Sequence, residues 1–432
     1  MELRISNYKS IVDQVSVKVD GLTILSGANS SGKSSFIQPF LIIKQTKDAS
    51  FSPEGLVLSG DSIQLSDSTD IVPINNKNKN KLFTVSILDE NYEEHVSFIK
   101  KRDEGIVPYD IYLNGDFYKI NEKFGSYSQV SYENRTNLEP IYSNGKKNGS
   151  LNINDVQVLS SEGVDFFYSI KSHKNSTVEK YKNRIANKIS VIGHDIIHIP
   201  GVRNITKRNL TITSGENQWM EGYKGSFEVY IPGIIYKWQR SGNKKLNILI
   251  ENLKKLSLTS NIKVNRKNDT IFEIMVSRNM FAQDSFVNIM DVGIGVSHVL
   301  PILVAGLVAK KNNIIYIEQP ELHLHPKAQE ILADIIIENI NNGCKYLIET
   351  HSSIFIRRVQ TLIALKKINK DKVSMNWFSI NEKGNTLVES ADIHADGSFG
   401  DWPANFESTY LNADDDYINA VANLLGFNDD SI

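Results

Sequence analysis

Residues 27–34 of the chain read GANSSGKS, which matches the pattern GxxxxGK[ST] at every fixed position. The stretch follows a short apolar run, LTILSG at 22–27, and precedes a segment of helical character. A strand, a loop and a helix are therefore expected in this order. Glycines in such a loop let backbone N–H groups turn toward a phosphate, and the N-terminus of the next helix adds partial positive charge. We predict a phosphate-binding loop at the opening of an α/β domain.

The side chains of this loop predict the first half of a nucleotide site. Lys33 is expected to contact the β- and γ-phosphates, and Ser34 is expected to offer its hydroxyl to Mg²⁺. ATP and Mg²⁺ are the cofactors that follow from this motif. The remaining nucleotide-binding residues expected around the loop are Asn29, Ser30, Ser31, Gly32 and Ser35.

A second apolar run, NIIYIE at 313–318, supplies the carboxylate that such a site needs at the end of a neighbouring strand. Glu318 is therefore the expected metal acid. The next position is where this class of ATPase keeps the glutamate that polarises the attacking water, and here it holds Gln319. An amide can position water but cannot accept its proton, so slow hydrolysis is expected. Glu321, two residues further on, is the alternative base.

Three histidines in or near this region are candidates for a chemical role. His351 follows the apolar run KYLIET, where a sensor of the γ-phosphate is expected, and the alternative is a surface histidine. His323 and His325 lie close to Glu321, but a zinc site would need further ligands that the sequence does not show. We therefore expect no metal ion other than Mg²⁺.

Several of these motifs together resemble a known family. IEQPELHLHP at 317–326, with DVGIGVS at 291–297 and IETHSS at 348–353, resembles the ATP-binding cassette (ABC) ATPases of the SMC and Rad50 superfamily. The nearest resemblance is to the bacterial OLD-like and Septu-type ATPases that serve in anti-phage defence. RISNYKSI at 4–11 and GDWPANF at 400–406 resemble the two ends of such proteins.

The resemblance covers about half of the chain and assigns roles residue by residue. In the middle of the chain only HIPGVRNITKR at 198–208 matches. The family pattern makes Glu318 the Walker B acid, Gln319 the occupant of the catalytic-glutamate position and His351 the switch histidine.

The resemblance also suggests where the signature motif of these ATPases lies. Gly293, Gly295 and Ser297 stand in its place, although VGIGVS differs from the standard LSGGQ. The N-terminus of the following helix would cap the γ-phosphate bound to a second copy of the chain. The alternative is a glycine-rich turn before an apolar core helix.

The predicted fold class is α/β: an ABC-type P-loop NTPase domain with an antiparallel β insert and a helical lobe. Residues 1–75 are expected to form the first half of the ATPase domain, and 76–270 the β-rich insert and the helical lobe. Residues 271–380 are expected to carry the signature, Walker B acid and switch histidine, and 381–432 a small C-terminal tail segment.

Composition limits the location and partners of the protein. The chain of 432 residues has a formal net charge of -2, one cysteine and no stretch near the ~18 apolar residues of a membrane span. A soluble, cytoplasmic protein is expected, with no membrane partner. Two stretches, 171–188 and 244–267, are rich in Lys and Arg, which indicates either solvated surfaces or contacts with DNA.

The function expected from the resemblance is that of an ATP-dependent sensor or scaffold. It would assemble as a homodimer or higher oligomer and act with a separately encoded effector such as a nuclease, because the sequence shows no nuclease acid cluster. The alternative is a DNA-repair or recombination ATPase that clamps DNA through the two basic stretches. The motor of a membrane transporter is disfavoured, since the standard LSGGQ is missing and the insertions are long.

Overall fold

The structure is a computed structural model of the chain. It describes residues 1–49, 55–71, 73, 83–89, 92–101, 105–115, 119–123, 129–133, 142–143, 146–147, 156–159, 169–172, 196–203, 208–211, 225–269, 271–278, 285–311 and 313–400.

A mostly parallel sheet forms the centre of the molecule. Its strands, in spatial order, are β13 (Ile196–Ile199), β18 (Ile314–Glu318), β19 (Lys345–Glu349), β3 (Leu22–Gly27), β20 (Val373–Ile380) and β21 (Thr386–Ser390). Neighbours from β13 to β20 are parallel, and β21 runs antiparallel to β20. Most of these strands are continuous apolar runs, as expected of parallel strands covered on both faces.

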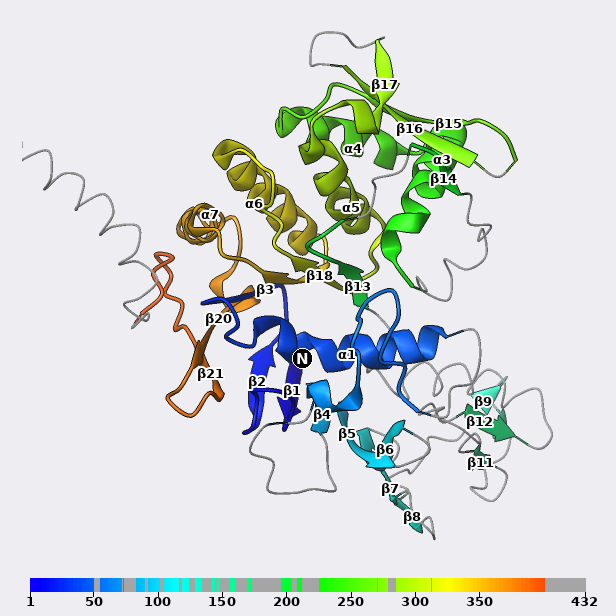
Figure 1. The fold of residues 1–432 in the computed structure, drawn as a ribbon, viewed down its shortest axis with the longest axis vertical. Helices are drawn as coiled ribbons and strands as arrows, with labels where there is room; N and C mark the ends of the chain where they lie inside the picture. The colour runs from blue at the N-terminus through cyan, green and yellow to red at the C-terminus, as the bar shows by residue number, and fades with distance from the viewer. Residues whose placement is uncertain are drawn as a thin grey trace, which may run out of the picture.

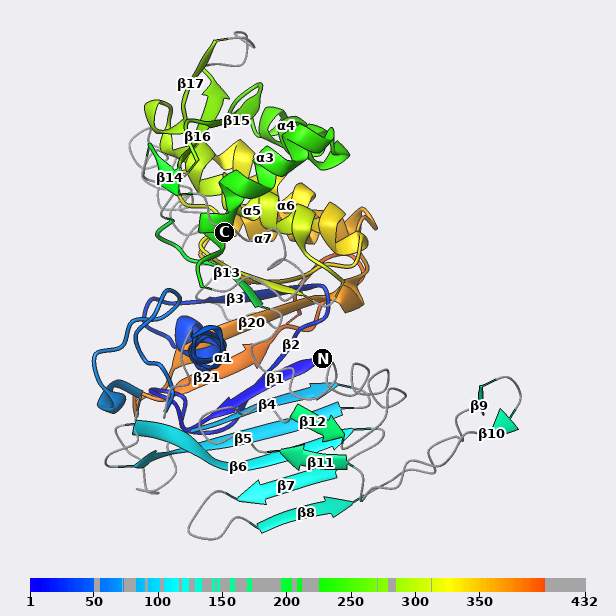
Figure 2. The same cartoon turned by 90° about the vertical axis from the view of Figure 1, so that its right-hand side faces the viewer.

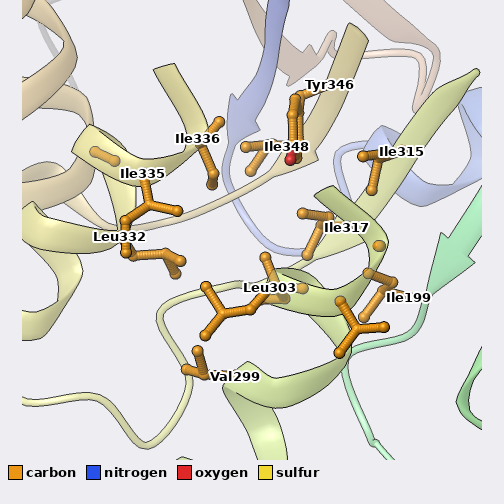
Figure 3. Packing of buried hydrophobic residues seen from close by; sticks show 14 of the residues in the cluster. Ile199, Val299, Leu303, Ile315, Ile317, Leu332, Ile335, Ile336, Tyr346 and Ile348 are labelled. Atoms are coloured by element: carbon orange, nitrogen blue, oxygen red, sulfur yellow. The ribbon is translucent and has the colours of Figure 1, made fainter. Parts of the chain in front are cut away.

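Helices cover the two faces of this sheet (Figure 1). One face carries α5 (Ile294–Val308), α6 (Pro326–Asn341) and α7 (Ser353–Ala364), and the other carries α1 (Lys33–Asp48). Figure 3 shows how side chains of α5 and α6 pack on strand residues such as Ile317 and Ile348. The sheet therefore separates two apolar cores, and α1 and α5 lie in different ones.

An antiparallel sheet packs against the far side of α1 (Figure 2). Its strand order is β2-β1-β4-β5-β6-β7-β8. The strands are β1 (Glu2–Ser6), β2 (Val15–Lys18), β4 (Phe83–Asp89), β5 (Tyr92–Lys101), β6 (Gly105–Gly115), β7 (Lys119–Lys123) and β8 (Gln129–Glu133). In β1 the buried side chains alternate with partly exposed ones, so that Leu3 and Ile5 face the core shared with α1.

A smaller lobe lies beyond α5 on the other side of the central sheet (Figures 1 and 2). Its helices are α3 (Ile231–Ser241) and α4 (Lys244–Lys255), and its strands are β14 (Leu210–Thr211), β15 (Ile262–Arg266), β16 (Ile271–Ser277) and β17 (Phe286–Asn288). Two short hairpins pair β9 (Tyr142–Ser143) with β10 (Lys146–Lys147), and β11 (Val156–Leu159) with β12 (Ser169–Ser172). Single 3₁₀ turns occupy Ser68–Ile71, Phe227–Tyr230, Ile289–Asp291 and Lys370–Lys372.

The predicted fold class is confirmed: the molecule is α/β, with an ABC-type P-loop core, antiparallel β strands and a helical lobe. Helices α3 and α4 lie within residues 76–270, the range that was expected to contain a helical lobe. The helix after the phosphate loop continues through Pro39, which is buried within it.

The range 76–270, expected as an insert, shares both large sheets with the rest of the chain. Its strand β4 pairs with β1, and its strand β13 pairs with β18. Strand β4 continues the antiparallel sheet beyond β1, and β13 forms one edge of the central sheet beside β18. In the described part of the chain no helix is long and apolar enough to cross a membrane.

Candidate nucleotide site

The phosphate loop connects β3 to α1 in a backbone conformation that its glycines make possible. Gly27 has a φ of 141° and Gly32 a φ of 100°, values that side chains rarely adopt. A Cβ atom on Gly27 would lie 2.1 Å from the carbonyl oxygen of Phe378, and one on Gly32 would lie 2.3 Å from Thr386 Oγ1. Both motif glycines are therefore required by close packing against β20 and β21.

Thr386, the first residue of β21, supports the phosphate loop directly. Its hydroxyl donates to the carbonyl oxygen of Ser31 at 3.0 Å and lies 2.8 Å from the hydroxyl of Ser10. Its backbone N–H donates to the carbonyl of Ser10. Thr386 falls in the range 381–432, which was expected to be a tail segment, so this role was missed from the sequence.

The other loop residues leave donors available around the turn. Asn29 and Ser30 are exposed, and Ser35 is half-buried. Ser31 is buried, and its Oγ has no hydrogen-bond partner among the described residues. Burying a hydroxyl group without a hydrogen-bond partner costs free energy relative to leaving it hydrated. Binding of a ligand that accepts a hydrogen bond from Ser31 Oγ would therefore be favoured here.

Lys33 and Ser34 begin α1 and point back toward the strand ends. Lys33 Nζ donates to the carbonyl oxygens of Gly27 at 3.1 Å and Ala28 at 2.7 Å. Burial lowers the pKa of Lys33, and the nearby Glu349 carboxylate opposes this effect. Ser34 Oγ lies 2.9 Å from both carboxylate oxygens of Glu349. The hydroxyl expected near Glu318 thus contacts a different acid, two residues before His351.

Glu318 and Glu349 are register partners at the ends of β18 and β19. Glu318 accepts hydrogen bonds from His198 Nε2 at 2.9 Å and from the backbone N–H of Gly201 at 3.0 Å. Burial disfavours its charged form, but these hydrogen bonds outweigh burial and bring the pKa of Glu318 below its usual value. Glu318, the expected Walker B acid, is therefore oriented by the segment at the end of β13.

Gln319 occupies the turn directly after Glu318. Its φ is 44°, in the left-handed region, and its N–H donates to the carbonyl of Glu349 at 2.7 Å. Left-handed conformations of non-glycine residues are held by their surroundings and occur at functional sites. A Cβ added to Gly201 would lie 3.5 Å from Glu318 Oε2 and 3.6 Å from Gln319 Oε1, so both side chains border the same glycine.

Glu321 is engaged in holding the segment that carries His351. Its two carboxylate oxygens accept from Thr350 Oγ1 at 2.8 Å and from the backbone N–H of His351 at 2.9 Å. Burial raises the pKa of Glu321. His351 is half-buried, and its pKa is lowered by burial and by the charge of Lys33. The switch histidine expected from the sequence thus lies within the electrostatic reach of the phosphate-loop lysine.

The segment expected as a signature motif opens α5, which begins at Ile294 with Gly293 as its N-cap residue. Gly293 is exposed, and so is Ile294. Gly295 packs against Leu258 and the backbone of His323. Ser297 is buried, and its hydroxyl donates to the carbonyl of Ile294 within the same helix. The start of α5 is therefore exposed, whereas Ser297 faces inward.

A buried arginine joins α5 to the Walker B segment. Arg203 donates from Nη1 to the carbonyl of His298 on α5 at 2.9 Å, and from Nη2 to the carbonyls of Glu318 at 2.9 Å and Gln319 at 3.2 Å. Burial lowers the pKa of Arg203 to about 10 despite nearby acids. Arg203 and His198 both lie in HIPGVRNITKR, a stretch that matched the family without suggesting a role.

The other two candidate histidines, His323 and His325, contact neighbouring protein groups. His325 caps α6 by accepting from the N–H of Lys327 through Nδ1, and His323 meets the ring of His298 edge to face at 4.7 Å between centroids. Within the described ranges, no three His, Cys, Asp or Glu residues gather as a metal site.

A glycine loop between a buried strand and a helix, with acids at the ends of the two strands beyond it, defines a P-loop ATPase of the ABC type. The chain belongs to the AAA ATPase domain family, whose model matches residues 1–356. Family membership implies nucleotide binding, usually with Mg²⁺, and the residues present fit such a ligand. Among the described residues, the Ser31 hydroxyl has no partner, and Lys33 Nζ hydrogen-bonds only to loop carbonyls.

Comparison with solved structures finds SMC head domains. One is the SMC head bound to the C-winged helix domain of ScpA, at 14% identity and a TM-score of 0.46, covering 91% of this chain and 97% of that one. A second, derived from Pyrococcus furiosus, is an Smc head with an extended coiled coil bound to the C-terminal domain of ScpA, at 13% identity and a TM-score of 0.43, covering 90% and 95%. The SMC head domain from Thermotoga maritima gives 10% and 0.37, covering 91% and 98%. No curated protein matches the sequence.

Proposed function

We propose that this ATPase binds ATP with Mg²⁺ between two copies of the chain and hydrolyses it slowly, so that bound ATP holds the copies together. In this proposal the dimeric unit is a cytoplasmic sensor or scaffold of a bacterial anti-phage defence system. It regulates a separate effector such as a nuclease.

The observation that carries the ATP-binding part is the convergence of residues distant in sequence. Lys33 and Ser34 lie at the start of α1, and Glu349 lies at the end of β19. The hydrogen bond from Ser34 to Glu349 connects the helix start to the strand end. Glu318 lies in register with Glu349 on the neighbouring strand. In this arrangement Lys33 binds phosphate oxygens, the loop N–H groups orient them, and the acids face the cation, whose charge would offset that of the phosphates.

Slow hydrolysis follows from the residue after the Walker B acid. Gln319 has an amide where a general base is expected, and an amide accepts no proton from water. Glu321 is the alternative base, but both of its carboxylate oxygens are hydrogen-bonded to the segment that carries His351. That geometry supports a role for Glu321 in positioning His351.

The second copy is proposed because the start of α5 faces away from α1 and is exposed. Ile294 is 50% exposed and Met290 is 36% exposed, beside Gly293. Val202, next to Gly201 at the Walker B acid, is 80% exposed. These apolar side chains border the two halves of the site that a second copy would bring together.

The defence role is supported by the motif resemblance in residues 317–326 and 348–353. The DNA-clamp alternative is disfavoured by the charge arrangement around α4 and β15. Four of the cations that would carry it have acidic partners: Lys254 with Glu251, Lys255 with Glu338, Arg266 with Asp269 and Lys267 with Glu273. Most of the other basic stretch, from residue 173 to 188, lies outside the described residues.

The proposal is tested by replacing Gln319 with Glu and measuring ATP turnover, ATP affinity and dimer mass. A base at this position should raise turnover on the order of 100-fold while ATP affinity is retained. Lys33→Ala serves as the control that loses nucleotide binding. Unchanged turnover in Gln319→Glu would refute the slow-hydrolysis part.

Two further measurements address the other parts of the proposal. A brisk wild-type turnover that Glu321→Gln abolishes would show that Glu321 is the base. Purification from native expression should retain a separate effector protein, and expression of the chain with that effector should reduce phage plating. A DNA fragment as the retained partner would favour the repair reading.

A further inference from the structure

The two carboxylates at the strand ends differ in what surrounds them. Glu318 and Glu349 are register partners on β18 and β19, so their backbones lie about 5 Å apart. Because β19 lies between β18 and β3, Glu349 is one strand closer than Glu318 to the phosphate loop. The acid nearest to Lys33 and Ser34 is therefore the one that the Walker pattern does not name.

Glu318 is directed toward β13 by fixed donors. The N–H of Gly201 and the ring nitrogen of His198 each contact one of its oxygens. A backbone N–H has one direction and cannot itself ligate a cation. These contacts tie Glu318 to the segment at the end of β13.

Glu349 contacts two hydroxyl groups. Ser34 Oγ lies 2.9 Å from both of its oxygens, and Tyr316 Oη donates to Oε2 at 3.1 Å. A hydroxyl proton can rotate, which leaves the oxygen lone pairs free to face a cation. Ser34 Oγ and the Glu349 carboxylate then form a pair of oxygen ligands of the kind that Mg²⁺ prefers.

The charge balance at this point also favours a cation. Glu349 is buried, and its register partner on the neighbouring strand is Glu318, so two carboxylates lie close together at this point. Lys33 is the phosphate-binding cation of the site, so it cannot also neutralise both acids once phosphate oxygens are present. A divalent cation beside Glu349 would offset this charge.

We propose that Glu349, together with Ser34, is a direct protein ligand of the divalent cation that accompanies the nucleotide, while Glu318 supports it from the β13 side. This inference rests on the proposed binding of ATP at the phosphate loop. It adds to the expected Walker B acid a second acid, from the end of the strand that precedes His351.

The test uses the full chain with the non-hydrolysable analogue AMPPNP. Mn²⁺ binding is measured by electron paramagnetic resonance, and AMPPNP affinity is measured by calorimetry with Mg²⁺ and with EDTA. Glu349→Gln should weaken Mn²⁺ binding in the nucleotide complex about 10- to 100-fold. Its AMPPNP affinity in EDTA should stay within about twofold of wild type, because Lys33 and the loop are unchanged.

Matched variants separate this role from a general loss of structure. Glu330→Gln removes a partly exposed carboxylate on α6 that pairs with Lys327, and it should leave Mn²⁺ binding unchanged. Ser34→Ala combined with Glu349→Gln should cost less than the sum of the single effects, since both remove ligands of one ion. Glu349→Asp keeps the charge and should recover part of the Mn²⁺ affinity if Glu349→Gln folds poorly.

The outcomes distinguish failure of the inference from failure of the proposed function. Wild-type Mn²⁺ binding in Glu349→Gln, with its loss in Glu318→Gln, would overturn the inference and leave ATP binding intact. Equal wild-type affinity for AMPPNP in Mg²⁺ and in EDTA would also overturn it. No wild-type heat with AMPPNP under either condition would overturn the proposed function and the inference with it.

Discussion

Replacing Thr386 with valine would test whether β21 supports the phosphate loop. The hydroxyl of Thr386 takes part in hydrogen bonds to the Ser31 carbonyl at 3.0 Å and the Ser10 hydroxyl at 2.8 Å, and the side chain is buried. Valine keeps the shape but removes both bonds. At about 0.5–1.5 kcal/mol for each, the variant should be about 1–3 kcal/mol less stable.

The same substitution should weaken nucleotide binding. If the bond to Ser31 holds the loop in its binding conformation, its loss requires nucleotide to reorder the loop, and ATP affinity should fall about two- to tenfold. Calorimetric titration with ATP and Mg²⁺ measures this. Thr386→Ser is the matched control, because it keeps the hydroxyl and removes a methyl group. If the valine variant binds ATP as tightly as wild type while the serine variant binds ATP more weakly, the reasoning is refuted.

Two further predictions concern the Walker B segment. In Arg203→Lys a single ammonium replaces two guanidinium nitrogens that together donate to three carbonyls. The free energy of unfolding, measured by urea denaturation, should therefore fall by about 1–3 kcal/mol. A change below about 0.5 kcal/mol would contradict this. The folded-state pKa of Glu318 lies below its usual value of 4.5, so its ionised form adds stability that is lost as the pH falls through and below 4.5. The melting-temperature difference between wild type and Glu318→Gln should therefore shrink from about pH 6 to about pH 4, and a constant difference would argue against it.

Local sequence was enough to predict the elements that carry the site. The glycine pattern and the flanking apolar runs predicted β3, the phosphate loop and α1 because each signal lies within about twenty residues. The same holds for β18 ending at Glu318 and β19 before His351. A strand or a helix start is a local property, so a short stretch of sequence can contain it.

Strand order could not be predicted in the same way. Glu349 lies in the quoted stretch IETHSS, but only the pairing of β19 with β3 places it beside Ser34. Thr386 reaches Ser31 only because β21 follows β20 at the end of the central sheet. These contacts join residues more than 300 positions apart, and no local pattern specifies which strands become neighbours.

The signature segment could also be predicted only in part from the sequence. The helix start at Gly293 was located from glycines and the apolar run that follows. Which side of the helix Ser297 faces depends on the packing of α5 against the sheet, and the structure turns it inward. A shift of one residue rotates a side chain by about 100°, so the register of a motif needs tertiary contacts.

The phosphate loop rests on Phe378 and Thr386, which are synthesised long after it. During translation the motif residues leave the ribosome early but cannot adopt the packed loop until β20 and β21 have followed. A truncation at residue 356, where the family match ends, would keep every expected nucleotide-site residue and lack both supports. Nucleotide affinity should therefore depend on whether the chain extends through β21. A shortened form of the protein that is meant to bind nucleotide should keep this strand.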